Sequence, residues 1–159
     1  MVSSNKKIAI FSKGRSHLWD LFLSMNQLGA EATFYSDVPK ARLKQFGYNN
    51  QNVHSYFLSI LPFLLKSRTK LNQKRADNNN RLWIERLDKK GSDCLEPCDL
   101  FIGLSGICNQ TLKTARKKYG SKIWIERGSV HILTQQSILA KINAENKIAK
   151  IPKIGRAHV

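Results

Sequence analysis

The sequence predicts an α/β fold in which helices cover both faces of a parallel sheet. Short apolar runs at residues 6–11, 99–104 and 122–125 are typical of buried strands. Each run leads into a polar turn that contains glycine, and residues with helical spacing follow. Strands that alternate with helices in this way pair in parallel, because each connection has to cross a face of the sheet.

The composition is that of one folded domain with a strongly basic surface. The chain has 159 residues, and 42% of them are hydrophobic, including 7 Phe, 3 Trp and 4 Tyr, which argues against disorder. Lys and Arg number 27 against 11 Asp and Glu, so the formal net charge is +16. A surface with this charge favours phosphate, anionic lipid or nucleic acid as a partner.

The first predicted unit is a strand, a glycine turn and a helix. Residues 6–11 form the strand, and residues 12–16 (SKGRS) form the turn. A helix begins at His17 and is expected to end at Gly29, because the apolar residues between them share one face. The residues of this expected face are Leu18, Leu21, Phe22, Met25 and Leu28.

The middle of the chain predicts two further strands and a helical excursion. Residues 32–35 and, more weakly, residues 53–56 have strand character. Residues 39–46 between them can hold a short helix. Residues 57–91 open apolar and then become basic and polar, which favours helices over further sheet.

The last third of the chain repeats the rhythm of strand and helix. A basic helix is predicted over residues 109–119, closed by Gly120. The strand at residues 122–125 then leads into residues 126–131 (ERGSVH), and another helix is expected from about Leu133.

The longest apolar run, residues 56–65, is about half as long as a membrane-spanning helix and contains Pro62, so no transmembrane helix is expected. A basic stretch, residues 66–75, follows it. This stretch is either a solvated face or a surface for anionic lipid headgroups, with the preceding apolar side chains pressed against the membrane. Those side chains are Phe57, Leu58, Ile60, Leu61, Phe63, Leu64 and Leu65.

The three cysteines favour a reduced, cytoplasmic protein. Cys94, Cys98 and Cys108 are odd in number, and their spacing fits neither C-x-x-C nor a zinc pattern, so no metal site is expected. The N-terminus lacks the longer apolar stretch of a signal peptide.

Three turns are expected to converge at the carboxyl edge of the sheet, where open parallel sheets bind ligands. They are residues 12–17, Ser105 with Gly106, and residues 127–131. Gly14 lets the backbone approach a ligand, and the helix start that follows it suits an anion. The turn has one glycine and no G-K-[ST], so a tight turn without a ligand is an equal alternative.

Other residues near these turns have both a structural and a functional interpretation. His131 can cap or pack, or it can serve as an acid or base near neutral pH. Arg127 can pair locally with Glu126, or it can bind phosphate or carboxylate. His17 and Asp20 can cap the first helix or contact a ligand.

Three pieces of the sequence are informative because of the order in which they occur along the chain. They are KIAIF followed by GRSHLWDL, CDLFIGLSG, and KIWIERGSVH followed by an I-x-x-Q-x-x-I-L helix. Together they resemble the N-terminal half of bacterial family 4 ("group 1") glycosyltransferases, whose GT-B architecture has two Rossmann-like domains. The resemblance covers about residues 6–139, although residues 57–91 align only in outline.

The resemblance implies a retaining transferase that moves a sugar from a nucleotide-sugar to a glycan or lipid-linked acceptor, without a metal or other cofactor. It implies that Gly14 and, by position, Arg15 approach the donor phosphates. The family's histidine at the reacting centre maps onto His131, which is the expected catalytic residue. The other residues expected to contact substrate are His17, Ser105, Gly106, Arg127 and Ser129. An enzyme of this kind is cytoplasmic, with peripheral attachment to the inner face of an anionic membrane as an open expectation.

The sequence lacks the family's second domain and its E-x7-E donor motif. We therefore expect residues 1–153 to be the acceptor-side domain, binding donor weakly and inactive alone. Residues 154–159 (IGRAHV) match what a common short-read sequencing adapter encodes in frame, and the two preceding adapter bases restrict residue 153 to Lys, Gln or Glu. Residue 153 is Lys. A natural basic tail is the less favoured alternative, because it requires these matches to be a coincidence. We therefore expect the tail to be foreign and the natural protein to continue beyond it.

Two other classes remain as alternatives. A basic nucleic-acid-binding module rests on the charge alone, because the sequence has no RRM signature, helix-turn-helix pattern or zinc spacing, so nucleic acid is the less favoured partner. A nicotinamide-dependent enzyme is disfavoured, because the second and third glycines of its fingerprint are missing after the first strand.

Overall fold

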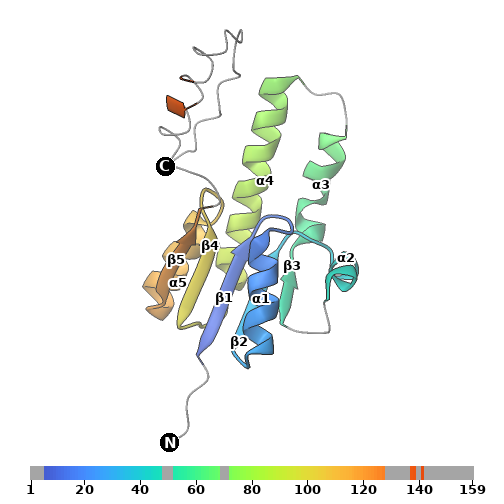
Figure 1. Ribbon diagram of the computed structural model, residues 1–159. Coiled ribbons are helices and arrows are strands. Elements are labelled where there is room, and N and C mark those ends of the chain that lie inside the picture. Colours follow the sequence, from blue (N-terminus) through green and yellow to red (C-terminus); the bar gives the residue numbers. More distant parts are fainter. Residues whose placement is uncertain (1–5, 48–51, 69–71, 128–136, 139–140, 142–159) are drawn as a thin grey trace, which may run out of the picture. The chain divides into compact units, whose positions relative to one another are not determined.

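The computed structural model describes residues 6–47, 52–68, 72–127, 137–138 and 141. The chain divides into two compact units, Met1–Glu126 and Arg127–Val159. The first unit is a five-stranded parallel sheet with helices on both faces, so the expected α/β, Rossmann-like fold is confirmed (Figure 1). The helix expected from about Leu133 lies almost wholly outside the described residues.

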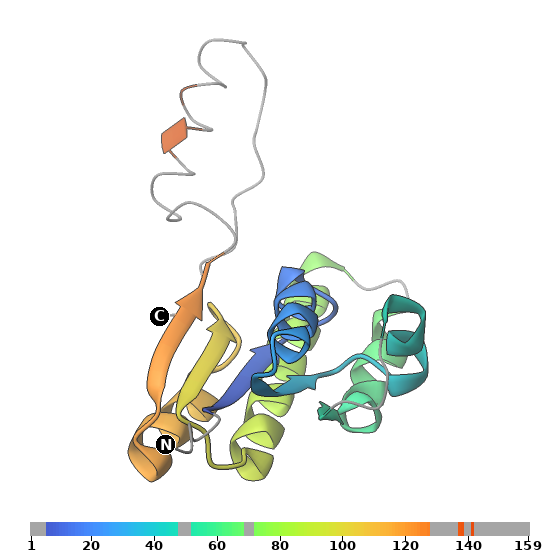
Figure 2. The same ribbon diagram turned by 60° about the horizontal axis from the view of Figure 1, so that its bottom comes forward.

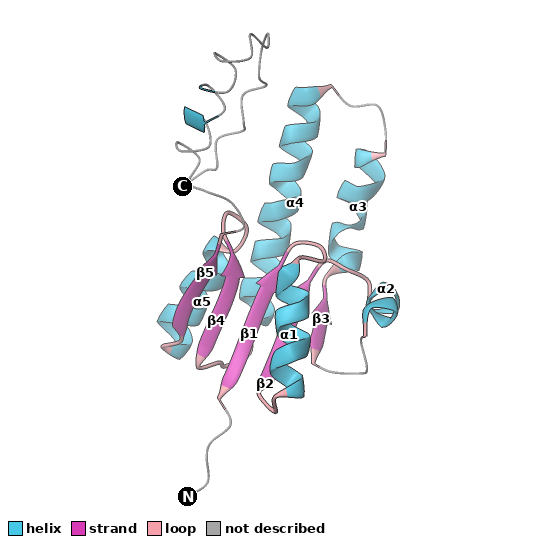
Figure 3. Ribbon diagram, in the orientation of Figure 1, coloured by secondary structure: helices cyan, strands magenta, loops and turns pink. Residues whose placement is uncertain are grey.

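The sheet has the strand order β3-β2-β1-β4-β5, and every neighbouring pair is parallel (Figure 3). The chain builds outward from β1 through β2 to β3 and then crosses back to place β4 on the other side of β1. The carboxyl ends of β1 and β4 therefore form the switch point of the sheet. The strands are β1 (Lys7–Ser12), β2 (Glu31–Ser36), β3 (Val53–Ser55), β4 (Leu100–Leu104) and β5 (Lys122–Glu126).

The helices form two layers, which Figure 1 shows in front of the sheet and behind it. The front layer holds α1 (His17–Gln27), and α2 (Lys40–Leu43) and the 3-10 turn η1 (Lys44–Phe46) lie at the β3 side. The layer behind holds α3 (Phe57–Ser67), α4 (Gln73–Cys94) and α5 (Asn109–Tyr119). The helices expected at residues 39–46, 57–91 and 109–119 are thus confirmed.

The residues that α1 buries against the sheet differ in part from those predicted from the sequence. Leu28, expected on the buried face, is 87% exposed, whereas Trp19 is fully buried. The helix ends at Gln27, before the turn that would bring Leu28 over the sheet, and Gly29 follows with a φ of 81°. The Trp19 ring packs edge-on against Phe34, with centroids 5.1 Å apart, and its indole N–H donates to a backbone carbonyl.

The core on the opposite face depends on a close approach of α4 to the sheet. Its fully buried members include Phe11, Ile60, Leu87 and Phe101. A Cβ at Gly91 would collide with the ring of Phe11 and lie 2.7 Å from the hydroxyl of Thr111 on α5. Gly91 is therefore the residue that lets α4, α5 and the sheet meet.

A buried carboxylate of α4 fixes the start of α5. Asp88, 5% exposed, accepts from the backbone N–H groups of Gln110 and Thr111 at 2.7 and 2.9 Å. The Thr111 hydroxyl donates to the same carboxylate at 2.7 Å. The residue that precedes α5, Cys108, makes no side-chain capping bond. Asp88 thus does from a neighbouring helix what an N-cap side chain does within one.

In the described part of the chain, no helix has the length and apolar character needed to cross a membrane. The three cysteines are free thiols, of which Cys94 is exposed. Burial, with a smaller contribution from Asp88, raises the pKa of Cys108 to about 12. Burial also raises the pKa of Cys98.

Candidate functional site

The switch point of the sheet brings two of the expected loops together. The β1–α1 turn, residues 13–16, follows β1, and the β4–α5 loop, residues 105–108, follows β4. Because β1 and β4 are paired neighbours, the structure places Gly14, Arg15 and His17 beside Ser105 and Gly106 at one edge.

The β1–α1 turn is shaped by a glycine and a serine. Gly14 has a φ of 68°, and no atom lies within 4 Å of the position that a Cβ would take, so the backbone conformation rather than lack of space selects glycine. Ser16 is the N-cap of α1, because its hydroxyl accepts from the N–H of Leu18 at 3.3 Å. Ser16 also shares a 2.7 Å hydrogen bond with Ser12 at the end of β1. The cap of α1 is therefore Ser16, and not His17 or Asp20 as one interpretation of the sequence had it.

The backbone N–H of Gly14 in this turn already has a hydrogen-bond acceptor, which is a buried carboxylate. The Gly14 N–H donates to Oδ1 of Asp37 at 2.5 Å. The indole N–H of Trp83, on α4, donates to Oδ2 of Asp37 at 2.9 Å. Asp37 directly follows β2 and is 5% exposed. The carboxylate of Asp37 thus lies where a glycine turn of this kind would otherwise bind the anionic group of a ligand.

Lys13 completes this network and is half-buried. Its ammonium group donates to Oδ1 of Asn80 at 2.5 Å and lies 4.3 Å from the centroid of the Trp83 ring. Burial lowers the pKa of Lys13, and the nearby Asp37 carboxylate opposes this effect. Lys13 therefore joins the turn to α4 and is not the cation that a ligand would meet first.

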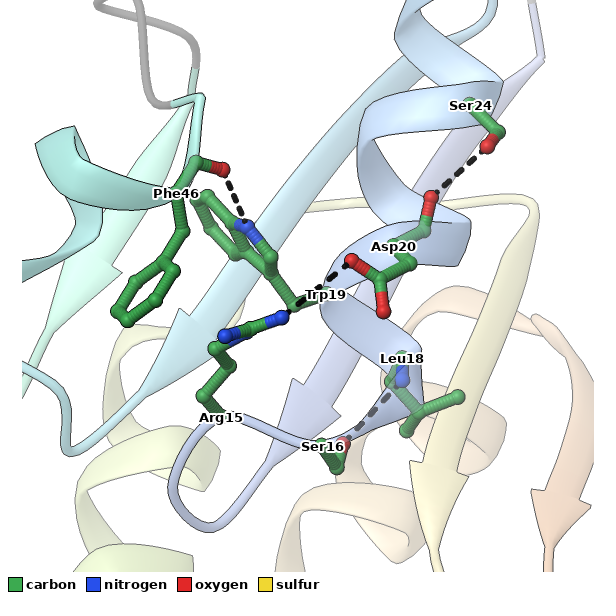
Figure 4. A network of polar contacts seen from close by, with 7 residues as sticks. All are labelled: Arg15, Ser16, Leu18, Trp19, Asp20, Ser24 and Phe46. Carbon is green, nitrogen blue, oxygen red and sulfur yellow. Dashed lines mark hydrogen bonds and ion pairs between the residues drawn. The ribbon is translucent and has the colours of Figure 1, made fainter.

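Arg15 is the exposed cation of the turn (Figure 4). Its guanidinium lies 4.1 Å from the centroid of the Phe46 ring and 4.0 Å from the carboxylate of Asp20. The Arg15 side chain is 44% exposed and that of Asp20 67%, so the ion pair is weak in water. Arg15 can leave these contacts at low cost to meet a phosphate.

His17 links the first helix to the end of β5. Its Nε2 lies 3.6 Å from Oε1 of Glu126, and these side chains are 54% and 31% exposed. The backbone carbonyl of Glu126 accepts from the N–H of Ser105 at 2.8 Å. The sequence suggested Arg127 as a partner of Glu126, whereas the structure gives Glu126 an ion pair with His17 when the imidazole is protonated.

The remaining site residues of the sequence prediction lie beyond this unit. Arg127 is exposed and begins the second unit of the chain. His131 and Ser129 lie outside the described residues. The catalytic role of His131 therefore stays a prediction.

The residues that hold the turn were not among the site residues predicted from the sequence. Asp37 carries one usable signal, since it follows the second strand directly and so had to lie at the carboxyl edge. Trp83 and Asn80 carry none, because only the packing of α4 behind the sheet brings them to the turn.

A pocket of about 170 Å³ lies at the opposite, amino edge of the sheet. Residues at the starts of β1 and β2 line it together with Glu96 and Cys98 from the loop before β4. The imidazole of His54 stacks on Tyr35 at 4.8 Å and lies 3.3 Å from the Glu96 carboxylate. This pocket shares no residue with the switch point, and nothing in its lining favours one class of ligand.

No protein-family model matches the chain, and no curated protein matches it. Among solved structures, it is similar to TcCGT1 in complex with UDP, with 14% identity and a TM-score of 0.48 over 91% of this chain and 33% of that one. It is also similar to the C-terminal domain of a hydrogenase from Pyrococcus furiosus, with 14% identity and a TM-score of 0.48 over 79% of this chain and 95% of that one. The chain spans about a third of the length of TcCGT1. The two names differ in kind, so they assign no ligand to this chain.

Proposed function

We propose that the chain is the acceptor-side half of a retaining, family 4 type glycosyltransferase, which moves a sugar from a nucleotide-sugar to a glycan or lipid-linked acceptor. The observation that supports this most is the position of the glycine turn at the switch point of the sheet, where open α/β sheets bind nucleotides. The pieces GRSHLWDL and LSG, which resemble the family, supply the two loops that meet there.

A donor diphosphate at the switch point would meet attraction and repulsion together. The positive end of α1 and the guanidinium of Arg15 attract it. The carboxylate of Asp37 repels it and occupies the amide of Gly14. Donor binding therefore requires Asp37 to release that amide, and for this reason too we expect this half alone to bind donor weakly.

Two histidines have different roles in the proposal. His17 begins the helix that follows the first of these loops, and its exposed imidazole, 3.6 Å from Glu126, can donate a hydrogen bond to a phosphate or sugar oxygen. His131, which is flanked by Arg127 and Ser129 in the sequence, would lie at the reacting centre, and this role rests on the sequence resemblance alone.

The gene beyond codon 153 provides one test. The proposal expects a second Rossmann-like segment with paired glutamates there, because that half would hold the donor. Sequencing genomic DNA through this point measures it directly. A genomic stop codon immediately after codon 159, or an unrelated downstream domain, would overturn the proposal.

Activity provides the second test. With the downstream half present, the enzyme should release nucleoside diphosphate from a nucleotide-sugar in the presence of acceptor, and His131→Ala should lower the rate by about a hundredfold or more. Residues 1–159 alone should release none. Measured release by residues 1–159 alone would contradict the assignment of the donor site to a second half.

A further inference from the structure

Helix α3 is apolar on two faces, which is unusual in a chain with a net charge of +16. Ile60 is fully buried, and Phe57, Phe63 and Leu64 pack against the core. A hydrogen bond of 3.0 Å from the side-chain amide of Asn79 to the carbonyl of Phe63 ties this inner face to α4. The inner face thus accounts for only half of the apolar residues of the helix.

The outer face of α3 carries a second stripe, which we call the α3 stripe: Leu58, Leu61, Pro62 and Leu65. These residues are spaced i, i+3, i+4 and i+7, so they share one face of the helix. Leu58 is 79% exposed and Leu65 is 56% exposed, and Pro62 is exposed as well. Leu61 between them is half-buried. Three exposed apolar residues and a half-buried one on one face of a helix form a contiguous patch, and such patches mark interaction sites.

Basic residues follow the stripe without an acidic one among them. Residues 66–75 contain Lys66, Arg68, Lys70, Lys74 and Arg75 and no Asp or Glu. Arg68, at the end of α3, and Lys74 and Arg75, at the start of α4, are exposed. The apolar stripe and the cations are therefore contributed by consecutive parts of one helical hairpin.

This hairpin extends beyond the carboxyl edge of the sheet. Figures 1 and 3 show α3 and the first part of α4 rising past the ends of the strands, and Figures 1 and 2 show α3 on the β3 side next to α2. Asn80 is level with the β1–α1 turn, because it bonds Lys13. Residues 73–79 precede it by about two helical turns, so the start of α4 extends about 10 Å beyond the turn.

We propose that the α3 stripe and the basic residues at the tip of the α3–α4 hairpin form a docking surface for an anionic lipid bilayer. The leucines of the stripe enter the boundary between headgroups and acyl chains, while Arg68, Lys74 and Arg75 contact the lipid phosphates. The inference does not rest on the proposed enzyme activity. It fits that activity, because it holds the switch point of the sheet close to a lipid-linked acceptor.

A lipid surface explains the stripe better than nucleic acid does. Phosphate contacts alone would account for the cations, and nucleic acid would then stack bases on exposed aromatic side chains. The exposed side chains of the stripe are aliphatic. Aliphatic insertion also keeps part of the affinity at high salt, which phosphate contacts lose.

The test is co-sedimentation of the purified chain with vesicles of phosphatidylcholine, with and without about one-third phosphatidylglycerol. The chain should bind the anionic vesicles and bind the neutral ones far less. Lys74→Glu with Arg75→Glu should lower the vesicle partition coefficient by about 30-fold or more. This pair of changes places acids in the first turn of α4, which favours the helix, so loss of binding does not report loss of folding.

A second variant tests the stripe, and two matched controls accompany the pair. Leu58→Ser with Leu65→Ser should lower the partition coefficient by about tenfold or more. Leu28→Ser, at an 87% exposed leucine that directly follows α1, should leave it unchanged. Lys89→Glu with Lys113→Glu, two exposed lysines of α4 and α5, makes the same change in charge away from the tip and should lower it by less than about threefold.

Two results would overturn the proposal. One is binding to anionic vesicles that neither tip variant weakens more than its control. The other is binding that the charge variant weakens equally for vesicles and for duplex DNA while the serine variant has no effect, because the surface would then be an unspecific phosphate binder.

Discussion

Asp37 decides how the glycine turn can meet a phosphate. Its carboxylate accepts from both the Gly14 amide and the Trp83 indole, and it is buried. A negative charge in direct contact with the turn repels the negative charge of a donor diphosphate. Because the carboxylate is buried, solvent screens this repulsion only in part. The exposed guanidinium of Arg15 acts in the opposite direction.

The two charges give opposite expectations for one measurement. Asp37→Asn should tighten binding of a nucleotide-sugar by about tenfold, because the repulsion disappears while an oxygen acceptor remains. Arg15→Gln should weaken binding by about tenfold. Titration followed by NMR or calorimetry measures both, and urea unfolding first establishes that Asp37→Asn is folded.

Arg116→Gln removes the same charge as Arg15→Gln from the far end of α5 and serves as the matched control. It should change binding by less than about twofold. If Asp37→Asn weakens binding instead, the carboxylate contacts the ligand productively and the turn does not act as a phosphate site.

Cys108 makes the stability of the fold depend on pH above neutrality. Burial raises its pKa from 9.0 to about 12, so the folded chain keeps a proton that the unfolded chain releases. This contribution is fully present below about pH 9 and is lost as the pH rises toward 12, at up to about 1.4 kcal/mol per pH unit. Cys108→Ala should therefore show a shallower loss of unfolding free energy over that range, measured by urea unfolding at several pH values. Equal slopes for the two chains would show that Cys108 ionises as easily in the folded state as in the unfolded one.

At the scale of elements, α5 depends on a cap that another helix provides. Asp88→Ala leaves the backbone N–H groups of Gln110 and Thr111 without their acceptor, while the Thr111 hydroxyl keeps its bond to the backbone carbonyl of residue 88, so the free energy of unfolding should fall by about 2–3 kcal/mol. Asp93→Ala, at an exposed carboxylate of the same helix, should change it by less than about 0.5 kcal/mol. Urea unfolding measures both, and similar losses for the two variants would mean that Asp88 does not hold α5.

The sequence predicts elements well where local chemistry determines them. Gly120 ends α5 with a φ of 66°, as expected from a glycine after a basic last turn. Apolar spacing failed at Leu28, because spacing identifies a helical face but not the residue at which the helix ends. It missed Trp19 for a related reason, since a large ring reaches the core from beside the expected face.

At the scale of the whole molecule, the carboxyl-edge loops could be predicted from the sequence but the strand order could not. Each loop is visible as a glycine-bearing turn after an apolar run. That β4 pairs with β1 is a long-range contact, and it makes the Gly14 turn and the Ser105 loop neighbours. The Asp37–Trp83 bond joins residues 46 positions apart and depends on the packing of α4 behind the sheet. No local pattern encodes either contact.

The central claim is that nucleotide-sugar binds at the switch point between β1 and β4, and amide chemical shifts measure this most directly. Titration of the labelled chain with UDP-, GDP- and ADP-sugars should shift the amides of Gly14, Arg15, Ser105 and Gly106, saturating only at millimolar ligand because the other half of the site is expected elsewhere. Shifts confined to the amino-edge pocket around Lys7 and Glu96, or no shift with any of these ligands, would contradict it.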